Sequence, residues 1–212
     1  MRTWAIVVAA GSGTRFGGAK QFARLGDDTV VDRAVRVARN ACDGVVVVLP
    51  DDSSWDAPAG VACARGGATR SDSVRAGLAL VAPDADVIVV HDAARPLASP
   101  ALFERVIRAV VDGADGAVPA LPVADTVKRV EGDRIVETVP RDGLVGAQTP
   151  QAFRADALRA AHRVGAIDTD DAALVEANGG VVRIVPGDRR NLKLTLPDDL
   201  QLARALLDEA RA

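Results

Sequence analysis

Short, uninterrupted runs of apolar residues recur along the chain and are its most regular feature. They occupy residues 4–10, 45–49, 87–90, 117–121 and 181–185. A strand that is covered by helices on both faces has no solvent-facing side, so its sequence is continuously apolar and does not alternate. The runs therefore predict the buried strands of one sheet.

Between these runs lie segments in which apolar residues recur at intervals of three and four positions. The clearest cover residues 30–41, 73–81 and 102–111, and this spacing predicts helices with one apolar face. Strands and helices thus alternate, which favours an α/β fold: a Rossmann-like, mostly parallel sheet flanked by helices, with right-handed crossovers. In such a sheet, ligands bind beyond the carboxyl ends of the strands.

Residues 126–139 depart from this pattern because polar and apolar residues alternate. The alternation pivots on Glu131, Gly132 and Asp133, which is typical of an antiparallel hairpin. An isolated two-stranded hairpin is only marginally stable in water. We therefore expect residues 122–141 to form a protruding β-hairpin arm that packs against a second copy of the chain.

The last helix of the chain has a start signal of its own. Thr195 and Asp198, with Pro197 between them, have the spacing of a capping box with a proline in the first turn. We therefore expect the final helix to begin there.

Length and charge narrow the class of protein. The 212 residues contain no Pro/Ser-rich linker, so we expect a single domain over residues 1–212.

The formal net charge is −3, with four Phe, two Trp and no Tyr, so the chain lacks the positive field and the stacking surfaces of a nucleic-acid-binding protein. No apolar stretch reaches the roughly 20 residues of a membrane span. We expect neither nucleic acid nor a membrane as a partner.

Two details bear on the cellular compartment. Cys42 and Cys63 are too few for a disulfide framework or a structural zinc site, so we expect two small buried side chains in a reducing, cytoplasmic environment. The apolar run at residues 4–10 resembles part of a signal peptide, but it is short and leads into a glycine-rich loop. We interpret it as the first strand.

The loop after the first strand, AAGSGTRFGGAKQ, carries the strongest chemical signal. The dinucleotide fingerprint G-x-G-x-x-G fails because Phe16 replaces its third glycine. The P-loop pattern fails because Lys20 comes one residue late and no Ser or Thr follows it. Gly11 and Gly13 nevertheless allow backbone N–H groups to approach an anion, and Arg15 adds a second positive charge. We interpret the loop as a nucleoside-triphosphate site, with a glycine-rich turn bearing solvated cations as the alternative.

Three later stretches add polar residues where a parallel sheet builds its site. Asp92 and Arg95 in HDAARP follow the apolar run at 87–90, although a turn stabilised by an Asx hydrogen bond is the alternative interpretation. Ser73 ends GGATRSDS, where hydroxyls could simply cap a helix. Lys193 in NLKLT lies among apolar neighbours, and an exposed lysine is equally consistent with that pattern.

Taken together and in this order, seven stretches resemble the 2-C-methyl-D-erythritol 4-phosphate cytidylyltransferase family of the non-mevalonate isoprenoid pathway. The stretches are AAGSGTRFGGAKQ, GGATRSDSV, VHDAARP, DTVK, AQTPQAF, TDDA and NLKLT, and they span nearly the whole chain. The resemblance implies a single nucleotidyltransferase domain that transfers CMP from CTP to 2-C-methyl-D-erythritol 4-phosphate and releases pyrophosphate. It also implies a homodimer in which the arm reaches the partner subunit's site.

The resemblance assigns roles to individual residues. It implies a catalytic set that stabilises charge at the reacting phosphorus: Arg15, Lys20, Arg141 and Lys193. It implies nucleotide contacts by Ala9, Ala10, Gly11, Gly13, Gly67, Ser73 and Ala93. It implies polyol-phosphate contacts by Asp92, Arg95, Thr126, Arg141, Thr149, Thr169 and Lys193. Thr126 and Arg141 would act from the arm.

The chemistry of this reaction fits the residues present. The attacking phosphate oxygen is already anionic near neutral pH, so no strong general base is needed, in agreement with a chain whose histidines are His91 and His162 alone. Fixed cations and Mg²⁺ would relieve the repulsion between two polyanions. We expect the CTP phosphates to hold the Mg²⁺, with no dedicated metal site and Asp92 at most as a supplementary ligand.

Two departures from the family bear on specificity. This chain has Ala19 where many members have proline before the lysine, which bears on the rigidity of the loop. It has Ala68 in the base-reading loop, where some members have an acidic residue that could contribute to cytosine selection.

The sequence leaves several alternative functions open. A cytidylyltransferase acting on ribitol or glycerol phosphate would differ only in the polyol pocket. A non-catalytic nucleotide-binding regulatory domain would not need both Lys20 and Lys193. A sugar-1-phosphate nucleotidylyltransferase shares the glycine-rich opening but not the HDAARP stretch, and a dinucleotide-dependent dehydrogenase is disfavoured by the missing third glycine.

Overall fold

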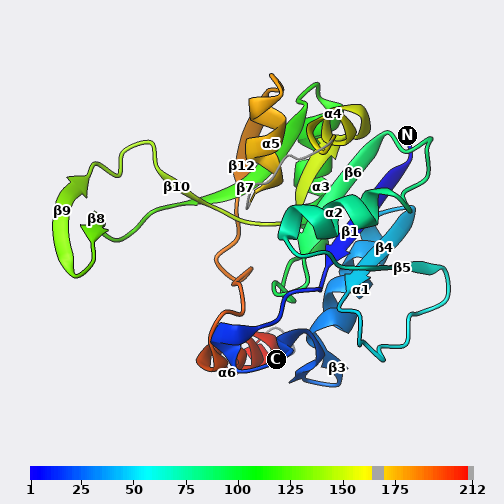
Figure 1. Ribbon diagram of the computed structural model, residues 1–212, viewed down its shortest axis with the longest axis horizontal. Helices are drawn as coiled ribbons and strands as arrows, with labels where there is room; N and C mark the ends of the chain where they lie inside the picture. Colours follow the sequence, from blue (N-terminus) through cyan, green and yellow to red (C-terminus); the bar gives the residue numbers. More distant parts are fainter. Residues whose placement is uncertain (164–169, 210–212) are drawn as a thin grey trace.

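The computed structural model describes residues 1–163 and 170–209. Its centre is a mixed sheet with the strand order β10-β7-β11-β6-β1-β4-β5, in which β12 also pairs with β7 (Figure 1). The strands of this sheet are β1 (Thr3–Val8), β4 (Gly44–Leu49), β5 (Val61–Arg65), β6 (Val87–Asp92), β7 (Gly116–Pro122), β10 (Val145–Ala147), β11 (Gln151–Arg154) and β12 (Val182–Pro186). The structure thus has the predicted α/β architecture.

The strands that lead to the site run in parallel. β1 pairs in parallel with β4 and with β6, and β4 pairs in parallel with β5. β12 is parallel to β7, whereas β10 and β11 are antiparallel to their neighbours. The register between β1 and β6 places Val8 opposite Asp92. The carboxyl ends of these two strands therefore meet at one edge, as the sequence predicts.

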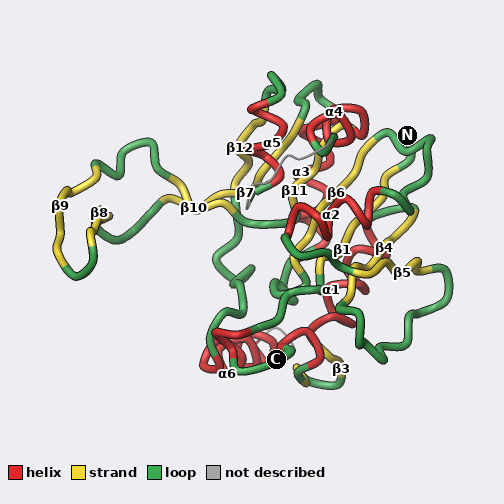
Figure 2. The backbone as a smooth tube through the Cα atoms, in the orientation of Figure 1, coloured by secondary structure: helices red, strands yellow, loops and turns green. Residues whose placement is uncertain are grey.

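Helices cover both faces of the sheet (Figure 2). The helices are α1 (Val30–Ala41), α2 (Arg70–Leu78), α3 (Pro100–Val111), α4 (Ala155–Ala161), α5 (Asp171–Ala177) and α6 (Pro197–Glu209). Along β1, Ala5 and Val7 pack into the cluster formed with α1 and α3, while Ile6 packs into the cluster formed with α2, α4 and α5. Because both faces are buried, the strand is apolar from Trp4 to Val8.

A third cluster connects the end of the chain to its beginning. Leu194 packs with Leu25, Val30, Ala203 and Leu207. Leu25 belongs to a small sheet of β2 (Arg24–Leu25) and β3 (Asp28–Thr29), and Leu207 belongs to α6. This cluster brings the segment before α6 to the loop that follows β1.

The predicted arm is present as a two-stranded sheet of β8 (Val127–Glu131) and β9 (Arg134–Val139). Its turn contains Gly132 at φ +61°, a left-handed conformation that favours glycine. Figure 1 shows the arm extending away from the body of the molecule. Val130 and Ile135 are 56% and 60% exposed, so one chain leaves the apolar residues of the arm in solvent.

The structure corrects several element boundaries. The helix predicted over residues 73–81 is α2, which begins three residues earlier because Thr69 and Asp72 form a complete capping box. The predicted capping box of α6 names the wrong carboxylate. The backbone N–H groups of Thr195 and Leu196 donate to Asp199, at 2.6 and 2.7 Å, rather than to Asp198. The short strands β5, β10 and β11 and the helices α4 and α5 are not predicted by the sequence pattern.

The cysteine prediction is partly wrong. Cys63 is exposed because it lies on β5, at one end of the strand order. Cys42 is half-buried, and burial raises the pKa of its thiol to about 12. Both thiols are free, so neither belongs to a disulfide. None of the helices within the described ranges combines the length and the apolar character that a bilayer crossing requires.

Candidate active site

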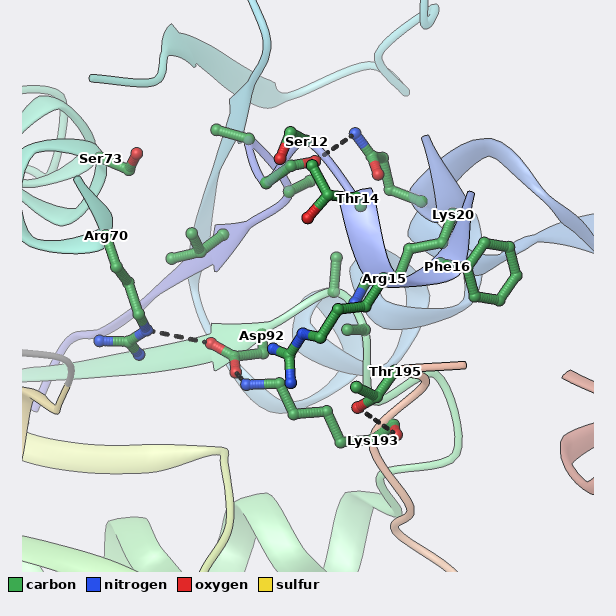
Figure 3. A pocket seen from close by; sticks show the side chains of 18 of the residues that line it. Ser12, Thr14, Arg15, Phe16, Lys20, Arg70, Ser73, Asp92, Lys193 and Thr195 are labelled. Atoms are coloured by element: carbon green, nitrogen blue, oxygen red, sulfur yellow. Dashed lines mark hydrogen bonds and ion pairs between the residues drawn. The ribbon is translucent and has the colours of Figure 1, made fainter. Parts of the chain in front are cut away.

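A cavity of about 550 Å³ lies at the carboxyl ends of β1 and β6. Its walls come from four distant parts of the chain: the glycine-rich loop after β1, the turn that leads into α2, the end of β6 and the segment before α6. Figure 3 shows side chains from these four segments around the same space. The volume is within the range of roughly 300–1,000 Å³ that is usual for small-molecule sites.

The glycine-rich loop is folded tightly upon itself. Gly13 has φ +65° and accepts hydrogen bonds from the N–H groups of Phe16 and Gly18, at 2.9 and 3.2 Å. A Cβ atom at Gly13 would lie 1.9 Å from the carbonyl oxygen of Gly18, so only glycine fits there. The loop continues through two short 3₁₀ turns, Thr14–Phe16 and Lys20–Phe22, which carry both of its cationic side chains.

Four cationic side chains line the cavity, and the three other than Arg70 carry the predicted catalytic roles. Arg15, Lys20 and Lys193 all line it, although Lys193 is far from the other two in the sequence. Lys20 Nζ donates to the carbonyl oxygen of Leu194 at 2.7 Å. Burial lowers the pKa of Lys20, and the positive charges of Lys193 and Arg15 lower it further. The cavity is therefore a site of concentrated positive charge, suited to a polyanion.

Asp92 lies at the end of β6 between two cations. Its Oδ2 accepts from Lys193 Nζ at 2.7 Å, and its Oδ1 accepts from Arg70 Nε at 3.3 Å. Burial alone would raise the pKa of Asp92, but the charges of Arg70 and Lys193 hold it well below its usual range. Asp92 is therefore a carboxylate at all physiological pH values.

Arg70 connects this carboxylate to a second, deeper one. Arg70 Nη1 donates to Asp171 Oδ2 at 2.6 Å, and Asp171 Oδ1 lies 2.9 Å from His162 Nε2. Burial alone would lower the pKa of the Arg70 guanidinium, but Asp171 and Asp92 raise it above its ordinary value. Arg70 lines the cavity and is permanently charged.

The turn before α2 brings backbone groups to the cavity wall. Gly67 N–H donates to Ser73 Oγ at 3.2 Å, and Ser73 Oγ donates to the carbonyl oxygen of Thr69 at 3.1 Å. A Cβ atom at Gly67 would lie 2.3 Å from the Cβ atom of Asp72. The capping interpretation of this stretch is correct for Thr69, the N-cap residue of α2, whereas Ser73 fixes the shape of the turn.

Behind Asp92, buried polar groups hold the strand end in place. Asp92 N–H donates to Thr149 Oγ1 at 3.0 Å, and the same oxygen lies 3.2 Å from His91 Nδ1. Burial lowers the pKa of His91 to about 4, so the imidazole is neutral at pH 7. Its ring packs edge-on against Phe103, with centroids 5.2 Å apart. His91 thus supports the site from within the core.

Comparison with known proteins identifies the family. The sequence profile described as 2-C-methyl-D-erythritol 4-phosphate cytidylyltransferase matches residues 3–209. The chain belongs to this family. The enzyme of that name from Rubrobacter xylanophilus is 44% identical over 96% of this chain and 94% of its own length, and that from Frankia casuarinae is 45% identical over 100% and 85%. The crystal structure of the Thermus thermophilus enzyme has a TM-score of 0.85 at 35% identity and covers 96% of this chain and 98% of its own.

Family membership answers the functional question left open by the sequence. Members of the 2-C-methyl-D-erythritol 4-phosphate cytidylyltransferase family transfer CMP from CTP to that polyol phosphate in the non-mevalonate isoprenoid pathway, and this is the activity of the chain. The predicted enzyme class is confirmed, as is the predicted fold.

The structure brings all of the predicted cytidylyltransferase nucleotide contacts into one cavity. The lining contains Ala9, Ala10, Gly11, Gly13, Gly67, Ser73 and Ala93. It also contains three of the four predicted catalytic residues, Arg15, Lys20 and Lys193, together with Asp92. Their presence in the lining supports the predicted roles without testing them.

Two predicted polyol-phosphate residues lie behind the cavity wall. Arg95 is half-buried and donates to the carbonyl oxygens of Asn191 and Ala147, at 2.8 and 3.4 Å. Thr149 is buried, and its hydroxyl oxygen accepts from Asp92 N–H. Neither side chain lines the cavity, and both tie β6 to neighbouring segments. Their contact with a substrate stays a prediction.

The two arm residues do not reach the cavity within one chain. Thr126 and Arg141 are exposed, and Arg141 Nη1 donates to the carbonyl oxygen of Ala124 at the base of the arm. This placement is compatible with action on a partner subunit, which stays a prediction. Thr169, the remaining predicted contact, lies outside the described residues.

A metal ion would find few protein ligands here. Among the described residues, no group of three or more His, Cys, Asp or Glu side chains could hold one. Asp92 is the carboxylate of the cavity lining, and both of its oxygens already accept from cations. The cavity lining could therefore add to the ligands that a substrate brings to Mg²⁺, but it could not hold the ion by itself.

Sequence reasoning missed Arg70 and its partners. Arg70 stands within the quoted stretch GGATRSDSV, but nothing in its spacing distinguishes it from a solvated residue at a helix start. Asp171 lies 101 residues further along, and His162 has no motif of its own. The connection exists only because the first turns of α2 and α5 meet in the folded chain.

Proposed function

We propose that the cavity binds CTP in the glycine-rich loop and that its fixed cations, rather than a proton-abstracting side chain, drive the transfer of CMP. The single observation that carries this proposal is the convergence of Arg15, Lys20 and Lys193 on one cavity. Gly11 and Gly13 also line the cavity, and their backbone N–H groups add partial positive charge to the same wall. The triphosphate lies against this loop, and the base lies against the turn at Gly67 and Ser73.

The reaction requires the exchange of one phosphorus–oxygen bond for another. An anionic oxygen of 2-C-methyl-D-erythritol 4-phosphate attacks the α-phosphorus of CTP and forms a new P–O bond. The bond between the α-phosphorus and the bridging oxygen breaks, and pyrophosphate leaves with that electron pair. No proton has to be removed from the nucleophile. His91, the histidine nearest Asp92 in the chain, is neutral and buried, which agrees with a mechanism that uses no base.

The cations act where negative charge accumulates. Arg15 and Lys20 lie on the nucleotide loop and stabilise charge on the α-phosphate and the leaving pyrophosphate. Lys193, held by Asp92 at 2.7 Å, orients the attacking phosphate. The cavity offers these groups before the substrate arrives, so little reorganisation is needed during the reaction.

Mg²⁺ is the cofactor we propose, held mainly by the phosphates of CTP with Asp92 as a supplementary ligand. When bound, it would neutralise part of the charge on the triphosphate. The protein's own residues still have to hold the two anions in line, because a divalent ion cannot cancel the charge of both substrates.

A second copy of the chain completes the site in our proposal. The arm over residues 122–141 crosses to the partner, where Arg141 and Thr126 meet the polyol phosphate. The exposed apolar residues of the arm, such as Val130 and Ile135, then become buried. We further propose that the enzyme is cytoplasmic, consistent with its two free thiols.

The experiment that tests this function measures pyrophosphate release from CTP with 2-C-methyl-D-erythritol 4-phosphate and, separately, with ribitol phosphate. We expect the methylerythritol substrate to turn over faster. Faster turnover of ribitol phosphate would overturn the assignment of the second substrate. Replacing CTP by UTP in the same assay tests whether a base-reading turn with Ala68 still selects cytosine.

A further inference from the structure

Four charged side chains of alternating sign form a continuous chain from the protein interior to the cavity. Asp171 accepts from Arg70 at 2.6 Å, Arg70 donates to Asp92 at 3.3 Å, and Asp92 accepts from Lys193 at 2.7 Å. His162 closes the inner end, 2.9 Å from Asp171. Figure 3 shows the outer part of this chain, with Asp92 between the side chains of Arg70 and Lys193.

The inner members cannot touch a substrate. The side chains of Asp171 and His162 are each 1% exposed, and neither lines the cavity. A buried ion pair contributes little net stability, because desolvation offsets the attraction between the charges, and well-packed apolar residues often replace it at no cost. Stability alone therefore gives a weak reason for a carboxylate at position 171.

The outer member needs a fixed partner. The Lys193 side chain is 44% exposed, and a flexible lysine on a surface loses rotamer entropy when it is held in one position. Asp92 fixes the position of the Lys193 amine, but only if the carboxylate is oriented with Oδ2 toward the lysine. Arg70 occupies Oδ1 and so fixes that orientation. Asp171 in turn fixes the guanidinium.

We propose that Arg70, with Asp171 and His162 behind it, is a positioning unit for the catalytic cation: it orients Asp92 and thereby aims the amine of Lys193 at the phosphate that attacks. This inference rests on the role proposed above for Lys193. A displacement of about 1 Å in such a group can cost about a hundredfold in rate even when the mutated residue is remote from the chemistry.

A double-mutant cycle between Asp171 and Lys193 tests the inference. Asp171→Asn keeps the shape and one acceptor oxygen but removes the charge that holds Arg70. In the wild-type background we expect it to lower kcat by about tenfold to a hundredfold, with a smaller effect on the KM for CTP. In a Lys193→Gln background we expect the same substitution to change kcat by less than about twofold, because the group that it positions is already gone.

The matched control is Asp115→Asn. Asp115 is a carboxylate that is likewise paired with an arginine, Arg154, at 3.3 Å and accepts from the N–H of Val181 at 2.9 Å. It is only partly buried, and it precedes β7 at the end of the sheet away from the cavity. We expect this variant to lose stability and to keep wild-type kcat.

The outcomes separate the inference from the proposed function. If Lys193→Gln alone keeps wild-type turnover, the role of Lys193 is wrong and the inference fails with it. If Lys193→Gln is impaired but Asp171→Asn costs the same factor in both backgrounds, the deep carboxylate is merely structural, and the inference alone is overturned. Should the Asp171→Asn chain not fold, His162→Gln takes its place in the same cycle with the same criterion.

Discussion

The cavity and the arm differ in how much of their structure a single chain provides. In the cavity, three of the side chains with predicted roles already have partners: Lys20 is held by Leu194, Lys193 by Asp92, and Asp92 by Arg70. On the arm, Val130 and Ile135 are mostly exposed, and the Arg141 side chain donates to the carbonyl oxygen of Ala124 at the base of the arm. The cavity is therefore preorganised within one chain, whereas the arm still exposes its apolar residues to solvent.

This difference separates two tasks of the enzyme. The nucleotide side of the reaction needs cations at fixed positions before the substrate binds, since preorganisation is the source of electrostatic catalysis. The polyol side, in our proposal, is completed by residues that another subunit delivers. We therefore predict that a substitution in the cavity inactivates the site of the same subunit, whereas a substitution in the arm inactivates the site of the partner subunit.

The largest effect is expected inside the cavity. Lys20→Ala or Lys193→Ala should lower kcat about a hundredfold to a thousandfold, because each removes one preorganised charge contact worth about 2.7–4 kcal/mol in the transition state. Steady-state pyrophosphate release measures this, and circular dichroism checks folding. Arg2→Ala, at the opposite end of β1 where Arg2 pairs with Asp84, is the control and should keep turnover. Near wild-type kcat in either lysine variant would remove that lysine from the catalytic set.

A mixing experiment should give an intermediate effect and tests whether the arm acts across subunits. Lys20→Ala and Arg141→Ala chains are each expected to be nearly inactive alone. When they are unfolded together and refolded, half of the dimers are mixed, and each mixed dimer has one site with both residues intact, so about a quarter of wild-type activity should return. No recovery on mixing would contradict the assignment of Arg141 to the partner's site.

The smallest effect is a shift along the pH axis. The amine of Lys20 must be protonated to stabilise negative charge, and its pKa is lowered from 10.5 by burial and by the neighbouring cations. As pH rises through this lowered pKa, kcat/KM should fall, at a pH below that of an ordinary lysine. Bound CTP brings negative charge and raises the pKa, so the fall in kcat should occur at higher pH.

Lys20→Arg is the variant that sharpens this measurement. Arginine stays protonated throughout the accessible range, so the decline in kcat/KM should move to higher pH even if the absolute rate is lower. An identical alkaline decline in the wild type and in Lys20→Arg would show that another group titrates.

The fold is largely predictable because its main elements have strong local signals. The helix predicted over residues 30–41 is α1, since the apolar spacing agrees with a complete capping box of Thr29 and Asp32. The strands β5 and β11 escape prediction because the apolar run of β5, residues 61–64, contains only small side chains, and β11 has just two consecutive apolar residues. β5 lies half-exposed at one end of the strand order, and β11 joins β6 to β7 in the antiparallel direction. Their conformation depends on tertiary pairing.

The site is predictable only where its residues belong to loops with distinctive composition. The glycine-rich loop and the Asp92 strand end are distinguished by glycine spacing and by position after an apolar run. The pairing of Arg70 with Asp171 bridges 101 residues, and no periodicity within either segment encodes it. Such long-range charge pairs are fixed by how the helices pack on the sheet, which one sequence does not reveal.

Leu194 has a position with consequences for anyone who alters this enzyme. Its side chain is fully buried against the final helix, its backbone oxygen accepts a hydrogen bond from Lys20, and the residue before it is Lys193. Packing of α6 against Leu194 thus fixes the backbone segment that holds Lys20 and carries Lys193, although α6 contributes no side chain to the cavity lining. Fusions, truncations of the last turns or proteolytic nicks near the carboxyl terminus would consequently alter turnover before they unfold the sheet.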